Sequence, residues 1–228
     1  MTSKSDASNL PEGIRNQFPN GDLPTSILEL TRNSVSEPIF NHSLRVYLFA
    51  KWLSEKEDQG LDDHALSLLF AACVFHDLGT CDAFNGPQRF EVEGADVAKS
   101  HLLARQIAES DAHKVWTAIA LHTSPGIAER IDPFTRLVRL AVLIDFSPAT
   151  RSSLGAVEYG REVEALLPRL DIEENLAKSV VCQAKGEQVV PDKTTYPSTQ
   201  KHPAGSWPGM LLRAHLENPG HQGRNPAF

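Results

Sequence analysis

The sequence LSLLFAACVFHDLG, residues 66–79, decides the fold class and locates a candidate site. Its first ten residues are apolar apart from one serine, so a helix here has no polar face and is expected to lie buried. The apolar residues lead directly into His76 and Asp77. An ionised carboxylate beside a histidine at the end of a buried helix is costly unless a partner compensates it. A divalent cation would compensate both, and the negative end of the helix favours it further.

Two other apolar helices are interrupted in the same way. The run LVRLAVLID, residues 137–145, ends in Asp145, and His42 lies on the apolar face of a helix expected over residues 38–57. Taken singly, His42 is typical of a core histidine, Asp145 of a helix-end acceptor, and His76–Asp77 of a salt-bridged pair. Together, two imidazoles and two carboxylates suit Zn²⁺, Fe²⁺ or Mn²⁺ and leave room for water.

Helical patterning covers most of the chain. The expected helices begin near Pro24 and then span residues 38–57, 62–77, 90–109, 112–122, 133–146, 157–167, 172–184 and 208–217. No stretch alternates apolar and polar residues as a half-buried strand does. The sequence therefore predicts an all-α fold with one domain over residues 24–186. A flexible arm, residues 1–23, precedes it, and a loop with a short helix, residues 187–228, packs on it.

Composition narrows the function classes. The 228 residues include 22 basic and 29 acidic side chains, which gives a net charge of −7, and 41% of the residues are hydrophobic. This acidic balance argues against a nucleic-acid binder. The chain shows no apolar signal segment and no run of ~18 apolar residues. Three scattered cysteines do not form a disulfide framework. We expect a cytoplasmic protein with a small-molecule substrate and without nucleic-acid or membrane partners; a homo-oligomer stays open.

The order of the polar residues resembles a known signature. His42, His76-Asp77 and Asp145 on an all-helical chain are similar to the H…HD…D pattern of the HD-domain metal-dependent hydrolases, over roughly residues 38–146. The segments NHSLRVY, HDLGT and FEVEG, which begin at residues 41, 76 and 90, resemble the cyanamide hydratase-like branch. The loop of residues 81–89 departs from the fungal hydratases of that branch.

The resemblance implies a fold, a metal and a reaction. The fold is a single HD-domain helical bundle with a metal site in its core. One divalent transition metal, Zn²⁺ or Fe²⁺, is expected to be bound by four residues, His42, His76, Asp77 and Asp145. The implied reaction adds water across the C≡N bond of cyanamide to give urea. Asp77 would then take part in catalysis as well as in metal binding.

Further residues have a functional and an ordinary interpretation. By resemblance, Glu91 accepts a proton from the activated water, although a glutamate in a first helical turn often only complements the helix dipole. His122 polarises the substrate or completes a second metal site, or it caps the last carbonyls of its helix. Thr80 and Asp82 line the pocket or stabilise a turn. Trp207 closes over the pocket or anchors the packing.

Other functions stay open at this stage. A phosphohydrolase acting on a nucleotide needs positive charge to hold phosphate, and only Arg45 and Arg89 are close to the motifs. A di-iron oxygenase of the same superfamily needs additional histidine ligands, which His101 and His122 would supply. A non-catalytic binding module is disfavoured, because it has no reason to retain four costly polar groups in apolar helices.

Overall fold

The computed structural model describes Leu10, residues 12–185 and residues 203–221. The predicted loop and tail segments at residues 1–9, 11, 187–202 and 222–228 lie outside the described residues. Its α-helices are α1 Glu12–Arg15, α2 Asp22–Ser34, α3 Glu37–Lys56, α4 Asp63–Phe75, α5 Phe90–Leu103, α6 Glu109–Leu121, α7 Ala128–Ile131, α8 Pro133–Phe146, α9 Pro148–Ser153, α10 Val157–Leu166, α11 Ile172–Lys185 and α12 Trp207–Glu217. Two 3₁₀ helices, η2 Leu78–Thr80 and η3 Asp82–Phe84, follow α4. The described residues include no strand, so the predicted all-α fold is confirmed.

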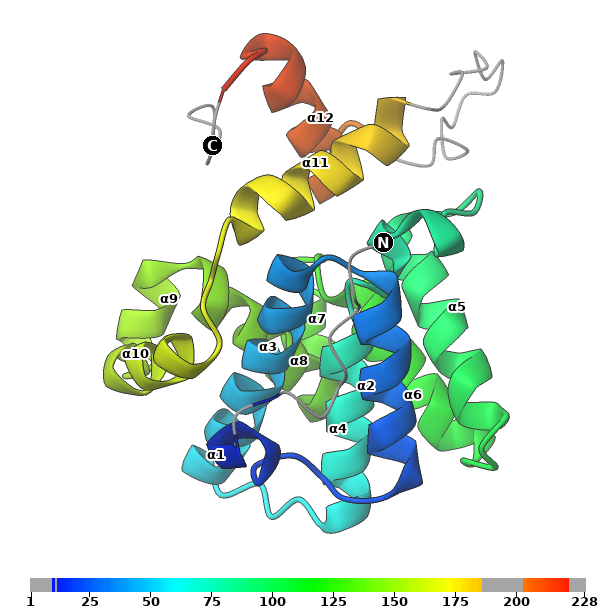
Figure 1. Ribbon diagram of the computed structural model, residues 1–228, viewed down its shortest axis with the longest axis vertical. Helices are drawn as coiled ribbons and strands as arrows, with labels where there is room; N and C mark the ends of the chain where they lie inside the picture. The colour runs from blue at the N-terminus through cyan, green and yellow to red at the C-terminus, as the bar shows by residue number, and fades with distance from the viewer. Residues whose placement is uncertain (1–9, 11, 186–202, 222–228) are drawn as a thin grey trace.

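Helix α4 forms the centre of the bundle, as its sequence predicts. Every residue from Leu68 to Phe75 is buried, with at most 2% exposure. Asp62 caps the helix by accepting a hydrogen bond from the backbone N–H of Ala65. Helices α2, α3, α5, α6 and α8 all contact α4 (Figure 1). The C-terminal end of α4 therefore lies in the interior of the protein.

Helices α3 and α8 pack against each other and against α4. Proline near the first turn of each helix has its φ angle already suited to a helix and needs no hydrogen-bond donor there. The N-cap Asp132 accepts a hydrogen bond from the backbone of Thr135 and fixes where α8 begins. The pairing of α3 with α8 brings segments one hundred residues apart in the sequence to the end of α4.

The turn after α4 packs tightly on α5. A Cβ atom on Gly79 would lie 2.0 Å from the carbonyl oxygen of Phe90 and 2.7 Å from the backbone nitrogen of Gly94. Only glycine allows the two backbones to approach this closely. Gly79 is therefore needed for more than ending the predicted helix, because it lets η2 lie against the first turns of α5.

Helices α11 and α12 form a second layer over one end of the bundle (Figure 1). They pack against each other, and α11 also contacts α3 and η2. A small hydrophobic cluster joins this layer to the bundle through Ile39, Phe90, Ile172, Leu176, Val180, Val181 and Leu211. The second layer therefore lies above the end of α3 that carries His42.

Two stretches differ from the sequence-based expectations. Residues 12–23 belong to the arm predicted over residues 1–23, but Ile14 is completely buried and the Phe18 ring lies 5.2 Å from that of Phe70. Helix α1 has only four residues, which is too short to show a periodicity. The helix predicted over residues 90–109 ends at Leu103, and Gln106 adopts a positive φ of 62° in the turn before α6.

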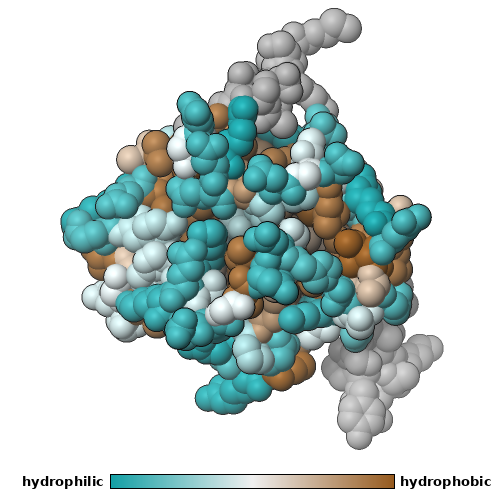
Figure 2. All heavy atoms as spheres, turned by 90° about the horizontal axis from the view of Figure 1, so that it is seen from below, coloured by the Kyte–Doolittle hydropathy of each residue, from teal (hydrophilic) through white to brown (hydrophobic). Residues whose placement is uncertain are grey.

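The outer surface is mainly hydrophilic on one face, which is consistent with the burial of most apolar residues in the core. On the face shown in Figure 2, hydrophilic side chains predominate and hydrophobic residues appear in separate small groups. Within the described part of the chain, no helix combines the length and the apolar character needed to cross a bilayer.

Candidate metal centre

Two helices bring three polar side chains to one buried point. His42 lies in the second turn of α3, and His76 and Asp77 directly follow α4. Nε2 of His42 lies 3.1 Å from Nε2 of His76. Oδ2 of Asp77 lies 3.5 Å from Nε2 of His42 and 3.2 Å from Nε2 of His76. All three residues are at most 2% exposed, and one ligand atom of each lies within 4.8 Å of the others. Such spacing fits ligands of a single metal ion with bonds of about 2.1 Å.

Hydrogen bonds on the far side of each imidazole determine which nitrogen faces this cluster. Nδ1 of His42 donates to Oδ2 of Asp145 over 2.6 Å, and Nδ1 of His76 donates to the carbonyl of Cys73 over 2.7 Å. Because carbonyl and carboxylate oxygens only accept, these partners assign the ring hydrogen to Nδ1. Nε2 of each ring is left with a lone pair directed at the cluster, as in metal-bound histidine.

His122 brings a third imidazole to the same place. It follows the last residue of α6, and its Nδ1 donates to the carbonyl of Ile119 over 2.7 Å. Its Nε2 lies 3.6 Å from Oδ1 of Asp77, and its ring centroid lies 4.9 Å from that of His76. His122 therefore combines the ordinary capping contact with a place beside the cluster.

The cluster contains acceptors without matching donors. The two Nε2 atoms that lie 3.1 Å apart both carry lone pairs in this tautomer, and the buried Oδ2 of Asp77 has no hydrogen-bond partner. A buried polar atom without a partner costs about 1–3 kcal/mol, and more when it is charged. Two imidazole nitrogens and one carboxylate oxygen are a donor set suited to Zn²⁺ or Fe²⁺. A divalent cation therefore fits the residues present.

The pKa values indicate the same need for positive charge. Burial works to lower the pKa of His76, but the Asp77 carboxylate and the Cys73 carbonyl outweigh it, and the pKa is raised. Burial works to raise the pKa of Asp77, but His76 and His122 hold it well below its usual range. Burial lowers the pKa of His42, although Asp145 offsets part of the effect. Asp77 is thus ionised and His42 neutral, which are the forms that bind a metal, whereas His76 is more easily protonated and would release a proton when a metal binds.

Asp145, the predicted fourth ligand, lies behind His42 and outside the cluster. Arg45 donates to both of its oxygens, over 2.9 Å from Nε and 2.7 Å from Nη2, and Arg169 donates to Oδ1 over 2.9 Å. Burial works to raise the pKa of Asp145, but the hydrogen bonds from His42 and Arg45 hold it well below its usual range. Both oxygens of this carboxylate are occupied by donors, and one of them holds His42 in place, while its role as a metal ligand stays a prediction.

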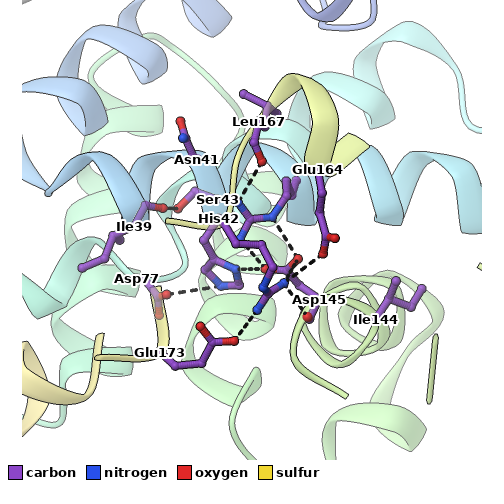
Figure 3. A network of polar contacts seen from close by, with 12 residues as sticks. Ile39, Asn41, His42, Ser43, Asp77, Ile144, Asp145, Glu164, Leu167 and Glu173 are labelled. Atoms are coloured by element: carbon purple, nitrogen blue, oxygen red, sulfur yellow. Dashed lines mark hydrogen bonds and ion pairs between the residues drawn. The ribbon is translucent and has the colours of Figure 1, made fainter. Parts of the chain in front are cut away.

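Arginine side chains around Asp145 form a network that sequence reasoning missed (Figure 3). Arg45 is completely buried, and its remaining nitrogen donates to two carbonyls in the loop between α10 and α11. Arg169, in the same loop, also pairs with Glu164 and Glu173. The arginine in NHSLRVY, on a helix face that includes His42, was the one available signal.

A cavity of about 410 Å³ lies over the cluster. His42, His76, Asp77 and His122 line its polar part. Its apolar walls come from α8, α11 and α12, and they include Val142, Phe146, Leu176, Trp207 and Leu211. The cluster is therefore accessible to a small molecule that enters the cavity.

Two of the three predicted substrate contacts differ in the structure. Trp207 lies in the cavity wall, with its ring 6.1 Å from that of Phe90. Thr80 does not line the cavity, because its hydroxyl donates to the carbonyl of Asp77 within the buried turn. Asp82 is exposed in η3, also away from the cavity. The turn roles of Thr80 and Asp82 are thus the ones that the structure favours.

Glu91 is completely buried but does not line the cavity. Its carboxylate accepts hydrogen bonds from Arg89 over 2.7 Å and from the Thr123 hydroxyl. Since the carboxylate is occupied and does not line the cavity, these contacts do not support the role of proton acceptor, which stays a prediction. Glu91 positions Thr123, which does line it.

The central part of the chain matches a known protein family. Residues 39–145 match the model of the HD domain family, from α3 to the end of α8. The match includes His42, His76 and Asp77, and HD domains are found in a superfamily of metal-dependent hydrolases that bind divalent metals. No match was found among the curated proteins.

Proposed function

We propose that this HD-domain protein holds one divalent cation, Zn²⁺ or Fe²⁺, through His42, His76 and Asp77, and adds water across the C≡N bond of a small neutral nitrile. Conversion of cyanamide to urea is the reference reaction. The observation that supports this most is the set of inward-facing acceptors, with Oδ2 of Asp77 lacking a donor, beneath an accessible cavity.

A bound divalent cation supplies Lewis acidity that lowers the pKa of coordinated water from 15.7 toward about 7. In the hydration, the water oxygen bonds to the nitrile carbon, one C≡N π bond breaks, and the nitrogen receives a proton. Tautomerisation of the resulting isourea then gives urea. No leaving group departs, so the cavity needs no separate site for one.

His122 is the residue that we assign to proton transfer. Its Nε2 faces the cavity beside Oδ1 of Asp77, and its Nδ1 hydrogen is held by Ile119. Nε2 can therefore take a proton from water and return it to the nitrile nitrogen. Asp77 would hold the imidazolium in place between these two transfers, because its carboxylate lies next to the charged ring.

Charges around the cavity favour a neutral substrate over a phosphoester. Arg139 lines the cavity, but its guanidinium donates to Glu129 and to the carbonyl of His122. Arg89 pairs with Glu91, and Arg169 pairs with three carboxylates, one of them Asp145. A phosphate would have to compete with these carboxylates for its donors.

A di-iron oxygenase also receives less support than a hydratase. Among the described residues, His42, His76 and Asp77 form the one group with metal-ligand spacing. His101, which would supply an extra ligand, is bonded to the Ser26 hydroxyl over 3.0 Å and does not line the cavity.

The test is urea release from cyanamide by protein loaded with Zn²⁺ or Fe²⁺, beside chelator-treated protein and a panel of nucleotides. We expect metal-dependent urea formation and no phosphate release. The variant His122→Asn should keep its metal and lose about 10²–10⁴-fold in rate, the usual contribution of a general acid or base. Loss of metal in this variant would make His122 a ligand instead, and phosphate release with inert cyanamide would overturn the proposal.

A further inference from the structure

The cavity is larger than the smallest nitriles require. At about 30 Å³ per water molecule, a cavity of about 410 Å³ corresponds to more than ten water molecules. Cyanamide would occupy a small part of this space. Cavities of roughly 300–1,000 Å³ are typical of sites that bind drug-sized ligands. The volume therefore indicates a substrate with a substituent beyond the reacting C≡N group.

The walls define the chemistry of that substituent. Phe146 of α8, Leu176 of α11, and Trp207 and Leu211 of α12 face the cavity. His42, His76, Asp77 and His122 line the same cavity. A molecule that fits both sets of side chains has a polar reacting end and an apolar body, since apolar surface gains free energy when it leaves water for such walls.

Besides Asp77 of the cluster, two charged side chains line the cavity, and they do not call for a charged substituent. Glu173 is bonded to Arg169 over 2.6 Å, and Arg139 is bonded to Glu129 over 3.1 Å. Each charge is thus matched within the protein. An additional charge on the ligand would lose water without gaining an unpaired partner.

We propose that the cavity selects nitriles bearing an uncharged apolar substituent, of which N,N-dialkylcyanamides are the reference class. This inference rests on the proposed hydration, which converts such a compound to the N,N-dialkylurea by adding one water molecule. Most of the apolar wall lies beyond residue 145, where the HD-domain match ends. The HD domain then supplies the reactive cluster, and α11 with α12 supplies the preference for the substituent.

Binding of the product series tests the cavity separately from catalysis. Titration calorimetry would compare urea with N,N-dimethyl-, N,N-diethyl- and N,N-dipropylurea on the metal-loaded protein. We expect affinity to rise roughly fourfold for each added methylene until the cavity is filled, with a negative heat-capacity change. Equal affinities across the series would overturn the proposal.

Variants that fill the cavity give the matched comparison. Ala177, on α11, lines the cavity, so Ala177→Phe should abolish the gain along the series while metal content stays unchanged. Met210→Trp, on α12, is a second variant for the case that the first fails to fold. Ala165→Phe, at an exposed position of α10, is the control and should bind like the wild type.

Hydration assays on cyanamide and the corresponding N,N-dialkylcyanamides distinguish the two proposals. Tighter binding of dialkylureas without turnover of any nitrile would leave the cavity preference standing and overturn the hydration. Turnover of cyanamide without any gain in affinity along the series would overturn the cavity preference alone. Support for both requires that dialkylcyanamides have a higher kcat/KM than cyanamide, and that Ala177→Phe removes this difference.

Discussion

Two buried aspartates lie on either side of His42 and have opposite surroundings. Asp145 is 4% exposed and accepts hydrogen bonds from His42, Arg45 and Arg169. Asp77 is 2% exposed, and its Oδ2 has no donor. We therefore expect the shortage of donors, and not burial alone, to distinguish a metal ligand, because a cation is the partner that satisfies a carboxylate and two imidazole lone pairs at once.

The largest expected effect concerns Asp145, the aspartate whose two oxygens both accept hydrogen bonds. Arg45→Met removes its bidentate partner and leaves Asp145 more poorly compensated in the core. Breaking one side of a buried ion pair typically costs about 3–5 kcal/mol, so we expect a loss of that size in the free energy of unfolding. Urea denaturation of the metal-free protein measures it.

Arg136→Met is the matched control for this loss. Arg136 also forms a bidentate pair, with Glu57, but both side chains are partly exposed. Exposed pairs contribute about 0–1 kcal/mol. Equal losses in the two variants would show that the burial of the Asp145 network has no energetic consequence.

The second effect concerns Asp77, whose Oδ2 has no donor, and it is a gain in stability that depends on bound metal. A cation that binds only the folded protein stabilises it by RT ln(1 + [L]/Kd), about 2.7 kcal/mol at one hundred times Kd. We expect this gain with Zn²⁺ or Fe²⁺ in the wild type and its absence in Asp77→Asn. Thermal unfolding with and without metal measures it, and an equal gain in the variant would remove Asp77 from the site.

A third, smaller effect distinguishes a structural role of Glu91 from a catalytic one. Glu91→Gln weakens the contacts to Arg89 and Thr123, and charge-assisted hydrogen bonds of this kind contribute about 1.5–3 kcal/mol. We expect a loss near 1.5 kcal/mol in stability, because Arg89 is partly exposed, with less than a tenfold change in kcat. A hundredfold fall in kcat at unchanged metal content would restore Glu91 as the base.

The smallest effect shows what burial does to a histidine without a carboxylate beside it. Burial, with Arg105 nearby, lowers the pKa of His101 to about 4 from 6.5. The unfolded chain therefore binds a proton between these pH values and the folded protein does not, so stability falls as the pH drops from about 6.5 to 4. Since His101 is only half-buried, the loss is on the order of 1 kcal/mol or less.

His101→Gln should make stability less sensitive to pH within this window. Denaturation midpoints at pH 7, 5.5 and 4 measure the difference between the variant and the wild type. Identical slopes in the two proteins would show that His101 titrates in the folded state as it does in the unfolded chain.

Local patterns predicted the fold and part of the site. The apolar run before His76 fixed α4 as the central helix, and polar residues in apolar helices identified His42, His76 and Asp77. The neighbours of Asp145 could not be found in this way, because Arg45 is one hundred residues away and meets it only after α3 packs on α8. The contact of Glu91 with Thr123 could not be predicted for the same reason, since Thr123 reaches it from the end of α6.

Metal content of two matched variants tests the central claim most directly. Wild type, Asp77→Asn and Asp145→Asn would be loaded with Zn²⁺, desalted and analysed for bound metal, with circular dichroism confirming that each is folded. We predict about one metal per chain in the wild type, none in Asp77→Asn, and metal retained in Asp145→Asn with affinity lowered about 10–100-fold, as for residues that orient a ligand. Full metal content in Asp77→Asn together with none in Asp145→Asn would contradict the claim.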